Sequence, residues 1–123
     1  MTLDEFSLKL HQAVIPGIIF VNPGGGTSEV ISVSSSKISY RRKSSTMTIR
    51  IESLYDAFSA FRNSRMSSPD LRAKWPVIFD SQARPAGHSC NVTFLFLCLK
   101  EMGLISQIMG QGVRGNPYYV DLR

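Results

Sequence analysis

The sequence predicts a small α+β protein, and three observations favour this fold class. Apolar residues recur at helical spacing near the N-terminus and again after residue 52. Between them, residues 29–51 contain β-branched runs and alternating apolar and polar residues, which are typical of strands. In the last third, an apolar helix stops at Gly103 and is followed by a strand, a glycine-rich tip at 110–117 and a second strand at 118–120. With 123 residues, the chain is expected to form a single domain with one shared core.

The N-terminal half, residues 2–51, is expected to begin with a helix over 2–15. Thr2 and Glu5 have the spacing of a capping box, in which each side chain binds the other's free backbone N–H. Four apolar residues at helical spacing give this helix a buried stripe: Leu3, Phe6, Leu10 and Val14. Pro16-Gly17 is expected to end it.

A small antiparallel sheet is expected to follow this helix. The strand-like runs are residues 18–21, 29–33, 37–41 and 47–51. The last two runs flank Arg42-Lys43-Ser44-Ser45, so they are expected to form a hairpin with a charged tip. Tyr40 is expected to be a cross-strand core partner rather than a base-stacking residue.

The C-terminal half, residues 52–122, is expected to contain three helices and the two-stranded ribbon. The first helix has four apolar residues on one face: Leu54, Ala57, Phe58 and Phe61. A second helix opens at Ser68-Pro69-Asp70, with Ser68 as its cap, and stops at Pro76. The third is expected to run from about residue 89 to residue 102.

This order of elements resembles the winged helix-turn-helix superfamily, over residues 52–122 only and without pointing to one family in it. The part that carries the resemblance is Leu99-Lys100-Glu101-Met102-Gly103-Leu104-Ile105, leading into the Gly-Arg-Gly tip. Two features depart from the superfamily. The connection over 76–88 is much longer than its usual turn, and the third helix is more apolar than a recognition helix.

The resemblance implies that the third helix enters the major groove of DNA by its first turns. In this sequence those positions are His88, Ser89, Asn91 and Thr93, with Arg84 just upstream. Asparagine can bind adenine, arginine can bind guanine, and the free N–H groups of a first helical turn suit a phosphate. The alternative is structural: Ser89 is only an N-cap and His88 only a loop residue with a local hydrogen bond.

Basic residues at two loop tips are further candidates for contacts with the DNA backbone. Arg114 lies among glycines that let a backbone approach a sugar-phosphate surface, or that merely form an irregular loop. Arg41, Arg42 and Lys43 lie in a fourteen-residue stretch, 37–50, that contains no acid. Together with Ser44, Ser45 and Thr46 they supply the side chains that phosphate contacts use, although a charged edge hairpin also prevents aggregation.

Composition favours an anionic partner. The formal net charge of +5 is compatible with nucleic acid without requiring it. Cys90 and Cys98 are expected to lie ~12 Å apart on one helix, too far for a disulfide, which fits a cytoplasmic protein. The first residues lack the pattern of a signal peptide, and no apolar run is long enough to cross a bilayer.

The sequence indicates a binding protein rather than an enzyme. It contains no phosphate-loop or dinucleotide motif, no metal-ligand spacing and no clustered carboxylates of a nuclease, so no cofactor or metal is expected. The expected function is non-catalytic binding of double-stranded DNA, as a regulator or as the target-recognition part of a restriction or mobile-element system. The alternatives are a protein-interaction module, including a homodimer, a pocket for a small ligand or modified base beside the 76–88 loop, and RNA binding.

Overall fold

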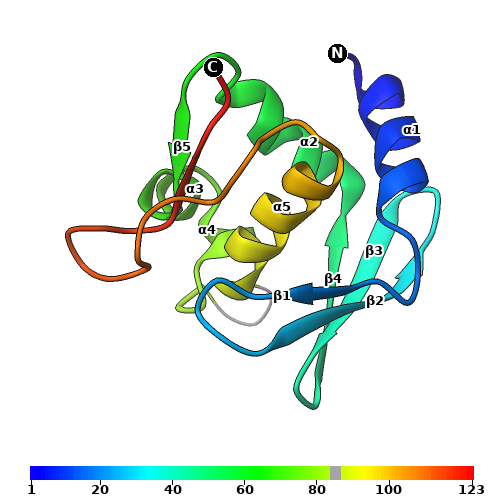
Figure 1. Ribbon diagram of the computed structural model, residues 1–123, viewed down its shortest axis with the longest axis horizontal. Coiled ribbons are helices and arrows are strands. Elements are labelled where there is room, and N and C mark those ends of the chain that lie inside the picture. The colour runs from blue at the N-terminus through cyan, green and yellow to red at the C-terminus, as the bar shows by residue number, and fades with distance from the viewer. Residues whose placement is uncertain (84–86) are drawn as a thin grey trace. The chain divides into compact units, whose positions relative to one another are not determined.

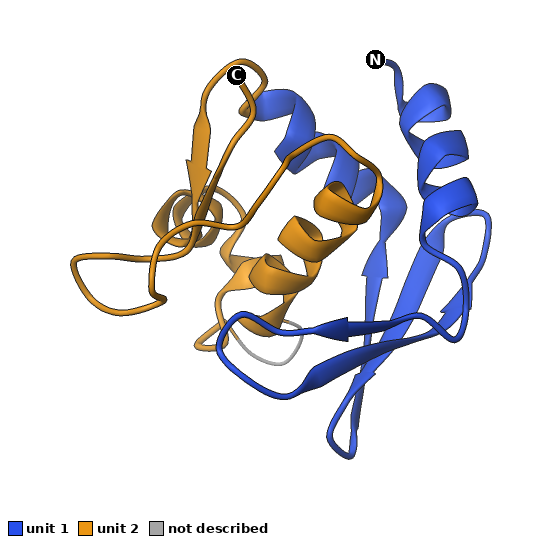
Figure 2. Cartoon of the chain, in the orientation of Figure 1, with its two compact units in different colours: residues 1–60 blue, residues 61–123 orange. Residues whose placement is uncertain are grey.

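The computed structural model describes residues 1–83 and 87–123 and confirms a small α+β fold. It holds a four-stranded antiparallel sheet, a two-stranded sheet and helices of 4 to 12 residues. The chain divides into two compact units, residues 1–60 and 61–123 (Figure 2). The expected boundary after residue 51 differs from this one, because the helix at 51–60 belongs to the first unit.

The first unit begins with α1 (Leu3–Ala13), whose start is the predicted capping box. The Thr2 N–H donates to Glu5 Oε1 at 2.9 Å, and the Glu5 N–H donates to Thr2 Oγ1 at 3.2 Å. The predicted inward residues Phe6 and Leu10 are fully buried. The helix ends two residues earlier than expected, with Val14 as its cap.

Four strands form the sheet of this unit in the order β1-β2-β3-β4 (Figure 1). Their bounds are β1 (Ile19–Val21), β2 (Thr27–Val33), β3 (Lys37–Arg42) and β4 (Ser45–Arg50). Val30, Tyr40 and Met47 are register partners across three strands, and all three are buried. The predicted alternation and the inward position of Tyr40 are therefore confirmed, because side chains on one face of a strand recur every second residue.

Helix α2 (Ile51–Ala60) starts directly after β4 and packs against α1. The ring of Phe6 lies 5.5 Å from that of Phe58 and, edge to face, 5.5 Å from that of Tyr55. These aromatic contacts join the two helices of the first unit.

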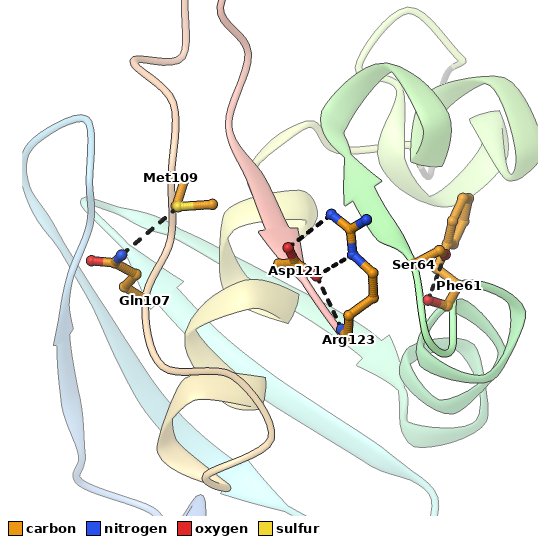
Figure 3. Close-up of polar contacts among 6 residues, drawn as sticks. All are labelled: Phe61, Ser64, Gln107, Met109, Asp121 and Arg123. Carbon is orange, nitrogen blue, oxygen red and sulfur yellow. Dashed lines mark hydrogen bonds and ion pairs between the residues drawn. The ribbon is translucent and has the colours of Figure 1, made fainter.

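The second unit contains β5 (Arg65–Ser67), α3 (Ser68–Lys74), α4 (Pro76–Phe79), α5 (Cys90–Glu101) and β6 (Tyr119–Asp121). The sequence pattern does not predict β5 or α4. The main partner of β6 also differs from the expected one: β6 pairs with β5, while the expected strand after Ile105 is reduced to one bridge between Met109 and Tyr119. Gln107 Nε2 lies 3.8 Å from Met109 Sδ beside this bridge (Figure 3).

Helix α5 is the most buried element of the second unit. From Asn91 to Leu99 only Thr93 is not buried. Its end is as predicted: Gly103 has φ +77°, and the Leu104 N–H donates to the Leu99 carbonyl at 2.9 Å. This is the hydrogen-bond pattern of a Schellman motif, which needs a left-handed residue after the helix.

The cap of α3 is Ser67, and the expectation that Ser68 caps it is wrong. The Ser67 N–H donates to Asp70 Oδ2 at 3.0 Å, and the Asp70 N–H donates to Ser67 Oγ at 3.3 Å. Ser68 is buried, and its N–H donates to the Tyr118 carbonyl at 3.0 Å. The shift by one residue follows from β5, whose last residue doubles as the cap.

None of the helices in the part of the chain that the structure describes combines the length and the apolar character needed to cross a bilayer.

Substituting Ser67→Ala is expected to lower the free energy of unfolding by about 1 kcal/mol, because Asp70 loses its capping partner. Ser67→Thr, which keeps the hydroxyl, is the control and should remain near wild type. Urea unfolding followed by circular dichroism measures both. If Ser68→Ala lowered the free energy of unfolding by about 1 kcal/mol and Ser67→Ala left it unchanged, the assignment of Ser67 as the cap would be wrong.

Candidate nucleic-acid interface

The β3–β4 hairpin positions the first group of candidate residues. Arg42 and Ser45 form its last register pair, so Lys43 and Ser44 make a two-residue turn. This tip lies at the end of the hairpin remote from α2, which follows β4 (Figure 1). Arg41 and Lys43 are exposed and Arg42 is half-buried.

The three cations at this tip are not neutralised by ion pairs. Glu29 is the register partner of Arg41 on β2, yet among the described residues no carboxylate lies within ion-pair distance of Arg41, Arg42 or Lys43. Ser44, Ser45 and Thr46 are exposed beside them. The tip therefore presents positive charge together with hydroxyl groups, as the sequence predicts.

The outer face of the sheet extends this polar surface away from the tip. Ser39 and Thr48 face each other across β3 and β4, with their hydroxyl oxygens 2.8 Å apart. Lys37 and Arg50 are register partners at the far end of the same two strands. The Arg50 guanidinium is partly neutralised there, because it lies 3.3 Å from the carboxylate of Glu52.

Lys43 has an unfavourable backbone conformation. Its φ is +56°, in the left-handed region that costs an L-residue other than glycine about 1–2 kcal/mol. Asparagine, aspartate and glycine are the residues that occupy this region most readily. The turn therefore holds a long cationic side chain at a position where a smaller residue would be less strained.

The first turn of α5 does not present the side chains that the winged-helix resemblance implied. Asn91 is 2% exposed, and its Nδ2 donates to the Ile78 carbonyl at 2.9 Å. The His88 N–H donates to the same carbonyl at 3.0 Å. The expectation that Asn91 binds a base is wrong, because its side chain is buried and its amide is hydrogen-bonded to the Ile78 carbonyl of α4.

The other expected contacts of this turn are also changed. Ser89 is exposed but makes no side-chain cap, and its backbone is already helical. The N–H groups of Asn91 and Val92 donate to the carbonyls of His88 and Ser89, both at 3.1 Å, so they are not free for a phosphate. Thr93 is half-buried, and its hydroxyl donates to the Cys90 carbonyl at 3.2 Å.

Arg84 lies outside the described residues. The remaining half-exposed or exposed positions at this end of the helix are His88, Ser89 and Thr93. Because the tip cations belong to residues 1–60 and the α5 candidates to residues 61–123, the expectation that they form one surface stays a prediction.

Arg114 lies at an exposed turn of the second unit. Val113 and Asn116 form a bridge that closes the turn, and the Asn116 N–H donates to the Val113 carbonyl at 2.9 Å. Gly115, with φ +86°, supplies the left-handed residue that the turn needs. Arg114 is exposed, and no carboxylate of the described residues pairs with it.

Gly112 gives this tip its shape. A Cβ at this position would lie 2.3 Å from the ring of Tyr118, and the glycine has φ +69°. Only a residue without a side chain allows the ring to lie this close to the backbone. The glycine-rich segment is therefore a folded tip on which Arg114 is exposed, and the contact of Arg114 with DNA stays a prediction.

Two arginines near β5 and β6, Arg65 and Arg123, already interact with other side chains of the protein. The Arg65 guanidinium lies 4.2 Å from the centre of the Tyr119 ring. Arg123 Nη2 and Nε each lie 3.0 Å from a carboxylate oxygen of Asp121 (Figure 3). These bonds from Arg123 lower the pKa of Asp121 to about 2. A carboxylate with a depressed pKa contributes stability above its ordinary pKa, and this contribution is lost as the pH falls through about 2.

Asn91 does not support the expected ligand pocket beside the 76–88 loop, because its side-chain amide is hydrogen-bonded to the Ile78 carbonyl of α4. One hollow lies elsewhere, in the first unit, among α1, the turn at 35–36 and the start of α2. Its volume of ≈ 160 Å³ is below the ~300 Å³ of the smallest usual ligand pockets. Within residues 1–83 and 87–123, no three His, Cys, Asp or Glu side chains come together as they would around a metal ion.

Comparison of the chain with protein-family models, with curated proteins and with solved structures gives no match.

Proposed function

We propose that this protein is a non-catalytic module that binds double-stranded DNA, with the β3–β4 tip as its principal contact. The observation that carries the proposal is the tip itself: no carboxylate of the described residues pairs with Arg41, Arg42 or Lys43, and Lys43 lies in a strained turn. Strained backbone conformations concentrate at functional sites. The strain at Lys43 therefore favours a binding role for the tip over the alternative that its charges only prevent aggregation.

The chemistry of the tip suits a DNA backbone. Arginine, lysine and small hydroxyl side chains make most contacts with phosphates, and these contacts supply affinity without sequence information. A two-stranded ribbon is also narrow enough to enter the major groove. We therefore assign backbone contacts to the tip and leave base reading to side chains that flank it in the groove.

Arg114 is the proposed second contact. In the winged-helix interpretation of the sequence, Arg114 lies at the tip of the wing, in the turn that the Val113–Asn116 bridge closes. Because α5 is buried from Asn91 to Leu99 except at Thr93, we assign the contact to this turn and not to the length of the helix. Of the helix-entrance residues, Ser89 remains a candidate for a phosphate contact.

The first prediction concerns binding of the wild-type chain to mixed-sequence duplex DNA. The logarithm of the binding constant should fall linearly with the logarithm of salt concentration, by ~0.9 for each phosphate neutralised. A slope of about −3.6 is expected if the three tip cations and Arg114 each neutralise one phosphate. Fluorescence anisotropy over a salt series measures it, and the absence of binding at low salt would reject the proposal.

The second prediction separates the role of Lys43 in binding from its effect on folding. Lys43→Gly should raise the free energy of unfolding by about 1 kcal/mol, because glycine tolerates the positive φ, and should reduce the salt slope by ~0.9. Lys43→Asn should behave similarly, with a smaller gain in stability.

Ser44→Gly is the matched control for this substitution. Ser44 lies beside Lys43 in the same turn but does not have a positive φ, so glycine there should give no gain in stability and leave the salt slope unchanged. Denaturant unfolding and anisotropy give the two quantities for each variant. Lys43→Gly binding DNA with the wild-type slope would show that the lysine does not contact a phosphate.

The third prediction tests Arg114. Arg114→Ala should reduce the salt slope by ~0.9 and leave the unfolding midpoint unchanged, because the side chain is exposed and forms no ion pair with any described residue. Arg123→Ala, which removes an exposed arginine that is bound to Asp121, is the control and should keep the wild-type slope. Equal slopes for Arg114→Ala and the wild type would remove the wing from the interface.

A further inference from the structure

Strand β1 is one of the two edge strands of the four-stranded sheet, the other being β4, and its exposed side chains are apolar. Ile19 is 60% exposed and Val21 is 76% exposed, while Phe20 between them is buried. Ile15, just before the strand, is 50% exposed. Exposed apolar residues on an edge strand mark a surface on which another strand can pair.

The backbone of β1 leaves four polar groups at this edge. The Val30 N–H donates to the Ile18 carbonyl and the Asn22 N–H donates to the Gly26 carbonyl, so residues 18, 20 and 22 turn their polar groups toward β2. The N–H and C=O groups of Ile19 and Val21 therefore point to the open side. None of these four groups has a partner among the described residues.

The charge pattern of the chain indicates which partner fits. No Asp, Glu, Lys or Arg occurs from residue 10 to residue 28, the longest such stretch in the sequence, and β1 lies inside it. Two copies of a chain with net charge +5 repel each other wherever cations meet, but not along this edge. The edge also lacks the lysine side chains that usually prevent strand pairing.

We propose that β1 pairs with β1 of a second copy of this chain, antiparallel about a twofold axis that passes beside Phe20. In this register Ile19 of one copy lies opposite Val21 of the other. By symmetry, Val21 of the first copy lies opposite Ile19 of the second. Both pairs are hydrogen-bonded pairs, so all four free backbone groups of each copy acquire a partner and the two sheets join into one continuous sheet.

Such an interface closes on itself. It is isologous, since each copy uses the same residues, and it occupies the only edge that β1 offers. Pro16 and Pro23 bound the strand and lack the N–H groups that a longer ladder would need. The result is a dimer rather than a fibre. This inference does not depend on DNA binding.

Cysteine crosslinking tests the register. The variant carries Ile19→Cys and Val21→Cys in a Cys90→Ser background, which removes the half-buried native thiol. Opposed residues of a hydrogen-bonded pair lie ~5.5 Å apart between Cα atoms, within the range of a disulfide. Within one strand, residues two apart have parallel side chains, so their Cβ atoms lie ~6.6 Å apart, beyond the ~4.5 Å that a disulfide allows.

The single-cysteine variants are the controls. In the proposed register identical residues of the two copies are diagonal neighbours ~7–8 Å apart, so neither Ile19→Cys alone nor Val21→Cys alone should crosslink. Mild oxidation followed by non-reducing electrophoresis should give a covalent dimer from the double variant only. Equal crosslinking of a single variant, or none in the double variant, would overturn the register.

Sedimentation velocity over a concentration series tests the dimer itself. The wild type should sediment as a dimer, and Val21→Lys should be monomeric at all concentrations, because it places two like charges in the interface. Val21→Thr keeps a β-branched, uncharged residue and should remain dimeric. Circular dichroism of each variant shows that the fold is retained. A wild type that stays monomeric at its solubility limit would refute the proposal.

Discussion

The register of the β3–β4 hairpin is the constraint on which the rest of the first unit depends. Pairing of Arg42 with Ser45 places Tyr40 opposite Met47, and both side chains then enter the core. A slip of one residue would turn these apolar side chains to solvent and bring cations inward, at a cost of several kcal/mol. The same pairing fixes the turn at Lys43 and exposes its charge, so core and candidate interface have one origin.

Because α5 is largely buried, the proposed DNA contacts are assigned to the turns at Lys43 and Arg114 and not to this helix. The apolar residues that identify α5 in the sequence are buried on most sides of the helix. The Asn91 side chain is also buried, where it donates a hydrogen bond to the Ile78 carbonyl. A helix used in this way cannot present a polar face to a groove. The turns at Lys43 and Arg114 are exposed, and both contain residues with positive φ; the tip that carries Arg114 is also shaped by the packing of Tyr118 against Gly112.

The net charge of +5 is distributed unevenly, and this distribution separates three roles. Arg50 and Arg123 are paired with carboxylates, and Arg65 lies on an aromatic ring, so these cations serve the fold. No carboxylate of residues 1–83 and 87–123 pairs with the cations of the two tips, and these cations suit a polyanion. The long charge-free stretch around β1 suits neither role, and like-charge repulsion elsewhere leaves it as the surface where two copies can meet.

The sequence by itself determined what depends on near neighbours in the chain. The capping box at Thr2, the alternation in β3 and β4, the charged hairpin tip and the glycine end of α5 could all be predicted, because their hydrogen bonds and side-chain periods are local. The tertiary structure decided what depends on distant partners. It paired β6 with β5, a strand of three residues that is too short to recognise and lies more than fifty residues away, and this pairing moved the cap of α3 to Ser67. Burial of Asn91 was likewise set by α4, because only packing decides which face of a helix remains in water.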